Sequence, residues 1–169
     1  MKRNIFVSAL LVIVTAISAL GQDTEESLRF RLLPLESEGL PAEAVTTIER
    51  KLRAAFNRTE SLTEDPSWSL EIRPELDLEE AMQTEGMVIE TGKVSGNMML
   101  TAQSAYDGTQ FHSAVIPLTA SAAGGKEAAM KALAASIKPT DPVFVRFIRN
   151  ARKKVAKYYQ EHPVETPEE

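Results

Sequence analysis

The chain has 169 residues, with 19 Lys and Arg against 24 Asp and Glu, two His and no Cys. The formal net charge of −5 argues against a nucleic-acid-binding protein. Without cysteine the chain has neither a disulfide framework nor a site for lipid attachment, and two histidines leave too few ligands for the usual transition-metal site. We therefore expect no metal and no cofactor.

The first residues resemble an export signal. Lys2 and Arg3 precede an apolar run over residues 5–17, and Ala19 and Gly21 offer small residues for signal peptidase. A retained membrane anchor is the alternative, but the run of about 13 residues is shorter than the roughly 20 that a spanning helix needs. We predict a signal peptide over residues 1–21, a mature chain that begins at Gln22, no transmembrane segment after cleavage, and a periplasmic or secreted protein.

Residues 22–162 are predicted to form a single α+β domain, and the Glu- and Pro-rich residues 163–169 a disordered acidic tail. Charge is unevenly distributed along this chain. Residues 22–92 hold 7 basic and 17 acidic side chains, whereas residues 93–169 hold 10 and 7. Such asymmetry indicates an acidic or basic partner, or else it is neutralised within the fold.

The first half predicts a strand, a helix and a second strand. Residues 28–32 alternate apolar and Arg, and Pro41 then suits the first turn of a helix over residues 41–57. Its apolar residues recur at three- and four-residue steps: Val45, Ile48, Leu52 and Phe56. Residues 70–78 alternate again, with Pro74 indicating an edge position or a bulge.

Asp107-Gly108 predicts a tight two-residue turn between strands 93–106 and 109–118. Pairing Tyr106 with Thr109 across this turn assigns one set of side chains to the core face: Met98, Leu100, Ala102, Phe111 and Val115. The other face receives Met99, Thr101, Gln103, His112 and Ile116. Asp at Leu100 should then unfold the domain, whereas Asp at Thr101 should be tolerated.

Two helices end the chain. Residues 126–136 are Ala-rich, and Lys138-Pro139 breaks this helix. A longer helix starts at Asp141-Pro142, a favourable cap and first position, and runs to about residue 160. Its apolar seam contains Phe144, Ile148, Ala151, Val155 and Tyr158. The expected fold is a two-layer α+β arrangement, in which helices 41–57 and 141–160 cover one face of a mostly antiparallel sheet.

The last helix also carries a basic face opposite its seam. At about 100° per residue this face contains Arg146, Arg149, Lys153 and Lys157. A solvated surface explains these residues, and so does a binding surface for an anionic partner, such as an envelope protein or an anionic envelope polymer. Both interpretations stay open at the level of sequence.

Catalytic patterns are few. Gly124-Gly125-Lys126 lacks the remaining residues of a phosphate-binding loop, and we interpret it as a flexible joint. A calcium site or an acid/base pair would have to use the carboxylates near residues 75–80, although the usual calcium-loop spacing is missing: Glu75, Asp77, Glu79 and Glu80. These carboxylates, assisted by His112, define the alternative hypothesis of a small exported hydrolase.

The assembled order resembles a group of exported bacterial proteins of unknown function. The matching segments are GLPAEAVTTIERKL, SLEIRP and GGKEAAMKALAASIKPTDPVFVRFIRNARKKVAKYY, between Leu40 and Tyr159. In that group a helix ending in a Tyr-Tyr pair follows a short Ala-rich helix. The order is also similar to the periplasmic domains of penicillin-binding-protein activators and curli-secretion lipoproteins. The resemblance brings no catalytic residue. The export signal, the scarcity of catalytic groups and the amphipathic last helix make a non-enzymatic periplasmic binding or envelope-assembly module the leading hypothesis.

Overall fold

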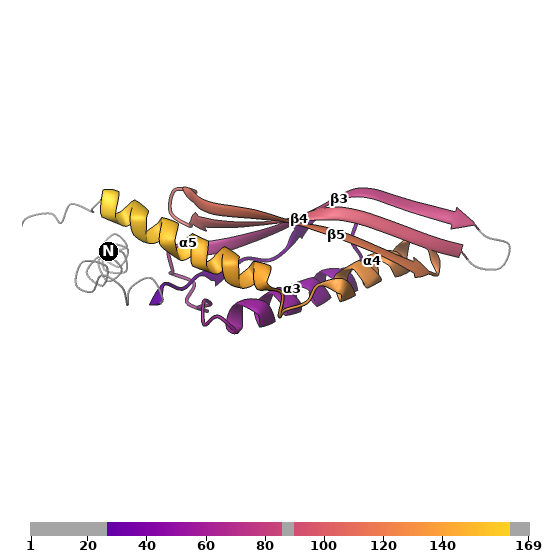
Figure 1. The fold of residues 1–169 in the computed structure, drawn as a ribbon, viewed down its shortest axis with the longest axis horizontal. Helices are drawn as coiled ribbons and strands as arrows, with labels where there is room; N and C mark the ends of the chain where they lie inside the picture. The colour runs from indigo at the N-terminus through magenta and orange to yellow at the C-terminus, as the bar shows by residue number, and fades with distance from the viewer. Residues whose placement is uncertain (1–26, 86–89, 163–169) are drawn as a thin grey trace, which may run out of the picture.

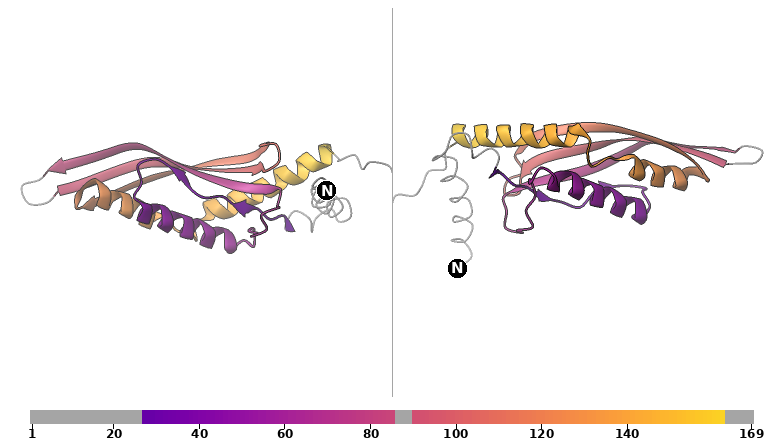
Figure 2. Two further views of the ribbon diagram at one scale, coloured as in Figure 1. Left: turned by 180° about the vertical axis from the view of Figure 1, so that it is seen from behind. Right: turned by 60° about the horizontal axis from the view of Figure 1, so that its bottom comes forward.

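The computed structural model describes residues 27–85 and 90–162. Over these residues the chain has an α+β fold, in which three helices pack on one face of a five-stranded, mostly antiparallel sheet (Figures 1 and 2). In chain order the elements are β1 (Arg31–Leu32), β2 (Glu36–Ser37), α3 (Ala42–Asn57), β3 (Leu70–Glu85), β4 (Glu90–Ser104), β5 (Gln110–Ala123), α4 (Gly125–Ser136) and α5 (Pro142–Glu161). The predicted fold class is confirmed. The predicted signal peptide and acidic tail lie outside the described residues.

The helices α3 and α4 follow the periodicity of the sequence. In α3 three of the four predicted apolar residues, Ile48, Leu52 and Phe56, are fully buried, and Val45 is half-buried. In α4 the buried side includes Met130 and Leu133. Lys51 of α3 joins the two helices. Its Nζ donates one hydrogen bond to Ala135 O near the end of α4 and another, of 2.8 Å, to Ile137 O just after the helix.

The long strands β3, β4 and β5 form an antiparallel meander, and the short β1 and β2 pair in parallel with the outer edge of β3. Pro74 does not interrupt β3. It lies between the segment paired with β1, which ends at Ile72, and the segment paired with β2, which begins at Glu75. The missing donor of Pro74 thus falls in a gap of the ladder, which agrees with the predicted edge position.

The connection between β4 and β5 is longer than the predicted two-residue turn. It spans residues 105–109, and Gly108 donates its N–H to Ser104 O at 3.0 Å. The carboxylate of Asp107 accepts hydrogen bonds from the backbone N–H of Thr109 at 3.0 Å and from its hydroxyl at 2.8 Å. These contacts close the loop around Ser104 instead of at Tyr106, which shifts the pairing by one residue.

The shift reverses the predicted faces of most of β5. Leu100 pairs with Ala114 instead of Val115, and Ala102 pairs with His112. Val115 is therefore 59% exposed on the face away from the helices, while His112 and Ile116 point toward them. Phe111 stays buried as predicted, because the ladder is irregular between Ala102 and Gln103.

The face away from the helices is polar but not uniformly exposed. Thr101 is 4% exposed and its Oγ1 lies 3.1 Å from Ser113 Oγ, and Gln103 is 7% exposed. The prediction that Thr101 lies on this face is right. The prediction that Asp is tolerated at Thr101 assumed an exposed side chain, and the buried position of Thr101 removes that reason.

Three glycines lie where α4 approaches the sheet closely. A Cβ on Gly92 of β4 would lie 2.1 Å from the carbonyl oxygen of Gly125, so no larger residue fits without a backbone shift. Gly124 and Gly125 both have positive φ, 99° and 81°, and Gly124 donates its N–H to Glu90 O at 2.8 Å. The joint at Gly124-Gly125 is thus attached to β4 by its backbone.

The observed register makes a direct test of the two faces possible. Leu100→Asp should unfold the protein, because an unpaired buried carboxylate costs several kcal/mol and a whole domain is stabilised by about 5–15 kcal/mol. Val115→Asp, in contrast, should change the free energy of unfolding by no more than about 0.5 kcal/mol, since Val115 is exposed. Thermal unfolding followed by circular dichroism measures both. Equal shifts in the two variants would contradict the register.

Candidate functional site

The candidate site is built on α5, whose position is set by its start and its inner face. Asp141 caps the helix, with its Oδ1 accepting a hydrogen bond from Val143 N at 2.9 Å, and Pro142 occupies the first turn. The ring of Phe56 on α3 meets the ring of Phe144 edge-on at 5.8 Å and that of Phe147 at 6.1 Å. These aromatic contacts hold α5 against α3 and the sheet.

The buried side of α5 is wider than the predicted seam. Phe144, Ile148, Ala151 and Val155 are buried as predicted, and Tyr158 is half-buried. Two buried residues were missed, Phe147 and Ala156. The seam prediction followed one line of residues at three- and four-residue steps, whereas a helix packed on a sheet buries a broader stripe.

The Tyr-Tyr pair at the end of α5 packs on the sheet. Tyr158 and Tyr159 lie 5.4 and 6.4 Å from the ring of Phe111, and 5.5 Å from each other. Burial raises the pKa of Tyr159, with smaller contributions from Tyr158 and Asp107. Since both side chains pack against the core, their first role is to fix the C-terminal end of the helix.

The opposite side of α5 presents the predicted basic residues to solvent. We call Arg146, Arg149, Lys153 and Lys157 the basic face of α5. All are exposed. Lys157 lies 3.6 Å from Glu161 one turn on, and no described carboxylate forms an ion pair with any of the other members. The basic face therefore keeps most of its positive charge uncompensated.

Two further cations of α5 have structural surroundings. Arg152 is half-buried and donates hydrogen bonds to Leu28 O at 2.9 Å and to Glu60 O at 3.3 Å, which joins α5 to the N-terminal segment and the loop after α3. Lys154 is exposed, and its charge acts on His112. The cations on α5 thus divide into a packing residue, a neighbour of His112 and the basic face.

The acidic residues proposed for a hydrolase lie on the other face of the sheet. We call Glu75, Asp77 and Glu79 the acidic row of β3. Asp77 and Glu79 are exposed and Glu75 is half-buried, and none of them forms an ion pair with a described cation. Glu79, at the irregularity between Leu78 and Glu80, accepts a hydrogen bond from Asn97 Nδ2.

His112 does not meet these carboxylates. It pairs with Ala102, which in turn pairs with the buried Ile72, so His112 lies on the helix-covered face of the sheet. Its ring stacks on Phe147, with centroids 5.5 Å apart and planes at 25°. The acid/base set of the hydrolase hypothesis is therefore not assembled in this fold.

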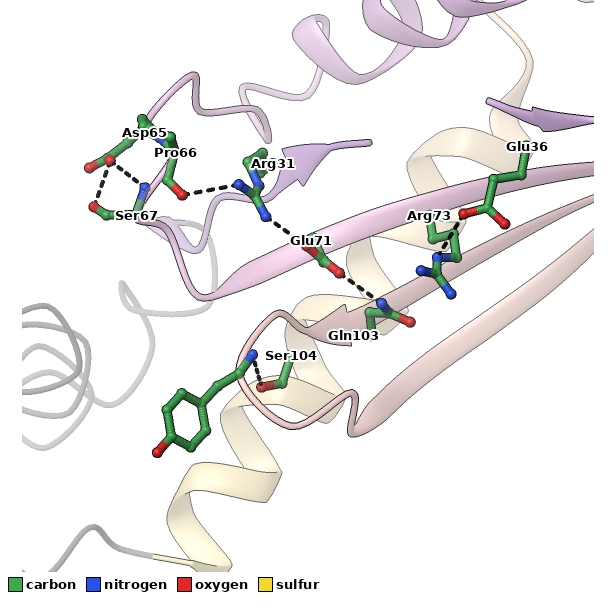
Figure 3. Close-up of polar contacts among 10 residues, drawn as sticks. Arg31, Glu36, Asp65, Pro66, Ser67, Glu71, Arg73, Gln103 and Ser104 are labelled. Atoms are coloured by element: carbon green, nitrogen blue, oxygen red, sulfur yellow. Dashed lines mark hydrogen bonds and ion pairs between the residues drawn. The ribbon is translucent and has the colours of Figure 1, made fainter. Parts of the chain in front are cut away.

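Ion pairs and hydrogen bonds that the sequence did not indicate lie near the start of β3, on the face of the sheet away from the helices (Figure 3). Arg31 Nη2 lies 2.9 Å from Glu71 Oε2, and Gln103 Nε2 donates to Glu71 Oε1 at 2.7 Å. Arg73 forms a looser ion pair with Glu36, with Nε and Oε1 3.4 Å apart. Glu71 of β3 is 7% exposed, and each of its carboxylate oxygens has a partner, Arg31 of β1 for one and Gln103 of β4 for the other. This carboxylate therefore links β1, β3 and β4.

The hollow beside Gly124-Gly125 does not resemble a phosphate site. It has a volume of about 760 Å³ and lies between the start of α4 and residues 39–41. The carboxylate of Glu90 lies at this helix start, about 3.2 Å from where a Cβ on Gly125 would be. A negative charge there already complements the positive end of the helix dipole, and it would repel a second anion.

Within the described part of the chain, no helix combines the length and hydrophobicity of a membrane span. Nor are three or more His, Asp or Glu grouped in residues 27–85 and 90–162 where they could hold a metal ion.

Comparisons with known proteins find neither a matching family model nor a matching curated protein. Several solved structures are similar over most of the chain. A DUF330 family protein from Xanthomonas campestris has 9% identity and a TM-score of 0.47, covering 79% of this chain and 88% of its own. The PelC dodecamer from Paraburkholderia phytofirmans has 13% identity and a TM-score of 0.37, covering 74% and 89%.

A minor lipoprotein from Acinetobacter baumannii has 14% identity and a TM-score of 0.34, covering 80% of this chain and 91% of its own. At such identities and TM-scores the likeness concerns the path of the chain, and we take no function from it. The predicted membership in an exported family stays a prediction.

The surroundings of His112 predict a pH dependence of stability. Burial lowers the pKa of His112 from 6.5, and Lys154 adds to this effect. The unfolded chain therefore binds the proton at a higher pH than the folded protein does. The neutral form of His112 therefore contributes to the free energy of unfolding. This contribution is complete above about pH 6.5 and is lost as the pH falls below that value.

Urea unfolding at about pH 7.5 and about pH 5.5 measures this effect, with His112→Gln as the variant that cannot titrate. The wild type should lose more of its free energy of unfolding between these values than the variant does. The carboxylates that both proteins share contribute equally and cancel. The same loss in both proteins would mean that His112 titrates alike in the folded and unfolded states.

Proposed function

We propose that the protein is a non-enzymatic binding or assembly module of the bacterial envelope, and that the basic face of α5 is its docking surface. The partner is an acidic envelope component, either a protein or an anionic polymer. The predicted signal peptide supports a periplasmic location, with secretion as the second choice, because export would bring the folded chain into the compartment that contains such partners.

One observation carries the proposal: the positive charges of the basic face are held on a fixed element, and only Lys157 among them has an ion-pair partner among the described residues. The helix is fixed because its other side is buried against α3 and the sheet. A partner therefore meets a row of cations with little loss of backbone entropy on binding, which favours association. Such a surface also speeds the encounter with an acidic partner, and this effect weakens with salt.

The alternative of a small hydrolase has no comparable observation in its favour. Glu75 and Asp77 lie on one face of the sheet and His112 on the other, so a substrate cannot contact all three. A hydrolytic site needs its acid and base within hydrogen-bond reach of the same reacting group. We therefore rank the binding module above the hydrolase.

The experiment is a pull-down from an envelope extract of the native organism, with the exported protein as bait. At low salt the wild type should retain one or more acidic components and release them at high salt. The variant Arg149→Glu, Lys153→Glu, Lys157→Glu should lose this binding, while its free energy of unfolding should change little because the residues are exposed.

A matched variant controls for the total change in charge. Lys93→Glu, Lys126→Glu, Lys138→Glu reverses the same number of exposed cations away from α5. It should retain the same components as the wild type. If the α5 variant and this control retain the same set as the wild type at low salt, the basic face is a solvated surface and the proposal fails.

A further inference from the structure

We propose that a partner of the basic face of α5 is a second copy of this protein, docked through the acidic row of its β3. The inference rests on the proposed function, since it uses the same docking surface, and it names one partner for that surface. It follows from the charges, spacing and placement of two surfaces that the fold keeps apart.

The two surfaces cannot neutralise each other within one chain. The basic face points outward from the helix layer, whereas the acidic row lies on the opposite face of the sheet, away from the helices. The sheet itself lies between them. Neither Arg149 nor Lys153 has an ion-pair partner among the described residues, and the same holds for Glu75 and Asp77. The charge asymmetry of the sequence therefore persists on the surface of the folded protein.

The spacing of the two rows is compatible with docking. A strand rises about 3.3 Å per residue, so Glu75 and Glu79 are about 13 Å apart along β3. A helix rises about 1.5 Å per residue, so Arg149 and Lys157 are about 12 Å apart along α5. Three acidic side chains of one copy can thus lie along three basic side chains of another.

Apolar side chains accompany both rows. Val115, 59% exposed, lies on the same face of the sheet as the acidic row, and Val145, 44% exposed, lies on the outer side of α5. Exposed ion pairs contribute little individually, so these apolar contacts would add to the attraction between copies. We expect a weak association that high salt disrupts.

The two docking surfaces are different, so the contact is heterologous. Each copy that binds through its basic face still has a free acidic row, and another copy can bind there. Such contacts produce a ring if the rotation between copies closes, and an open filament if it does not. An assembly of many copies is therefore expected, in which each copy uses both layers of the fold.

Sedimentation velocity of the protein purified after export tests the inference. The wild type should sediment faster as its concentration rises at about 20 mM NaCl, and as a monomer at about 500 mM NaCl. Two variants should be monomeric when alone: Arg149→Glu, Lys153→Glu, Lys157→Glu on α5, and Glu75→Lys, Asp77→Lys, Glu79→Lys on β3. Mixed in equal amounts, they should associate again, because each supplies the charge that the other lacks.

A mixture that stays monomeric, or a β3 variant that associates like the wild type, would overturn the inference. Circular dichroism checks the fold of each variant. If the lysines unfold β3, the milder set Glu75→Gln, Asp77→Asn, Glu79→Gln must still weaken association by about tenfold or more.

The outcomes also separate this inference from the proposed function. The β3 variant keeps the basic face, so it should still retain acidic envelope components in the pull-down. Retention of such components by a wild type that stays monomeric would remove the inference and leave the proposed function intact. If reversing the charges of the basic face changes neither the pull-down nor the sedimentation, both the inference and the proposed function fail.

Discussion

The packing of Phe56 against Phe144 and Phe147 is the contact on which the arrangement of the protein depends. It joins the first long helix to the last, and Phe147 in turn stacks on His112 of β5. Because all three Phe rings are buried, α5 cannot rotate about its axis without exposing them. The same contact therefore determines which side of α5 faces solvent. It holds the cations of the basic face in a fixed position on the surface.

The sheet imposes the second constraint, because it separates charges of opposite sign. Some charges are satisfied within the fold: Arg31 pairs with Glu71, and Arg152 donates to backbone carbonyls. Among the charges that are not, the basic face lies on the helix layer and the acidic row on β3. A protein with such an unequal surface is suited to recognition by charge, whether the partner is a different molecule or a copy of itself.

The sequence predicts best what depends on local periodicity. The helices α3 and α5 and the exposure of the basic face follow from residue spacing and from caps such as Asp141. The predicted register of β5 was wrong because the loop before it is longer than the Asp-Gly pair alone indicates. Hydrogen bonds from Thr109 to Asp107 make Thr109 part of this loop. The pair Arg31–Glu71 was missed because its members are 40 residues apart in sequence, with no local signal that joins them. The separation of His112 from the acidic row depends on that same register.

The most direct test compares the two sides of α5 by urea unfolding. Phe144→Ala should lower the free energy of unfolding by about 3–5 kcal/mol, because it removes a buried aromatic ring. Lys153→Glu should lower it by no more than about 0.5 kcal/mol, because its side chain is exposed and has no ion-pair partner among the described residues. Similar losses in the two variants would contradict the division of α5 into a packing side and a free basic face.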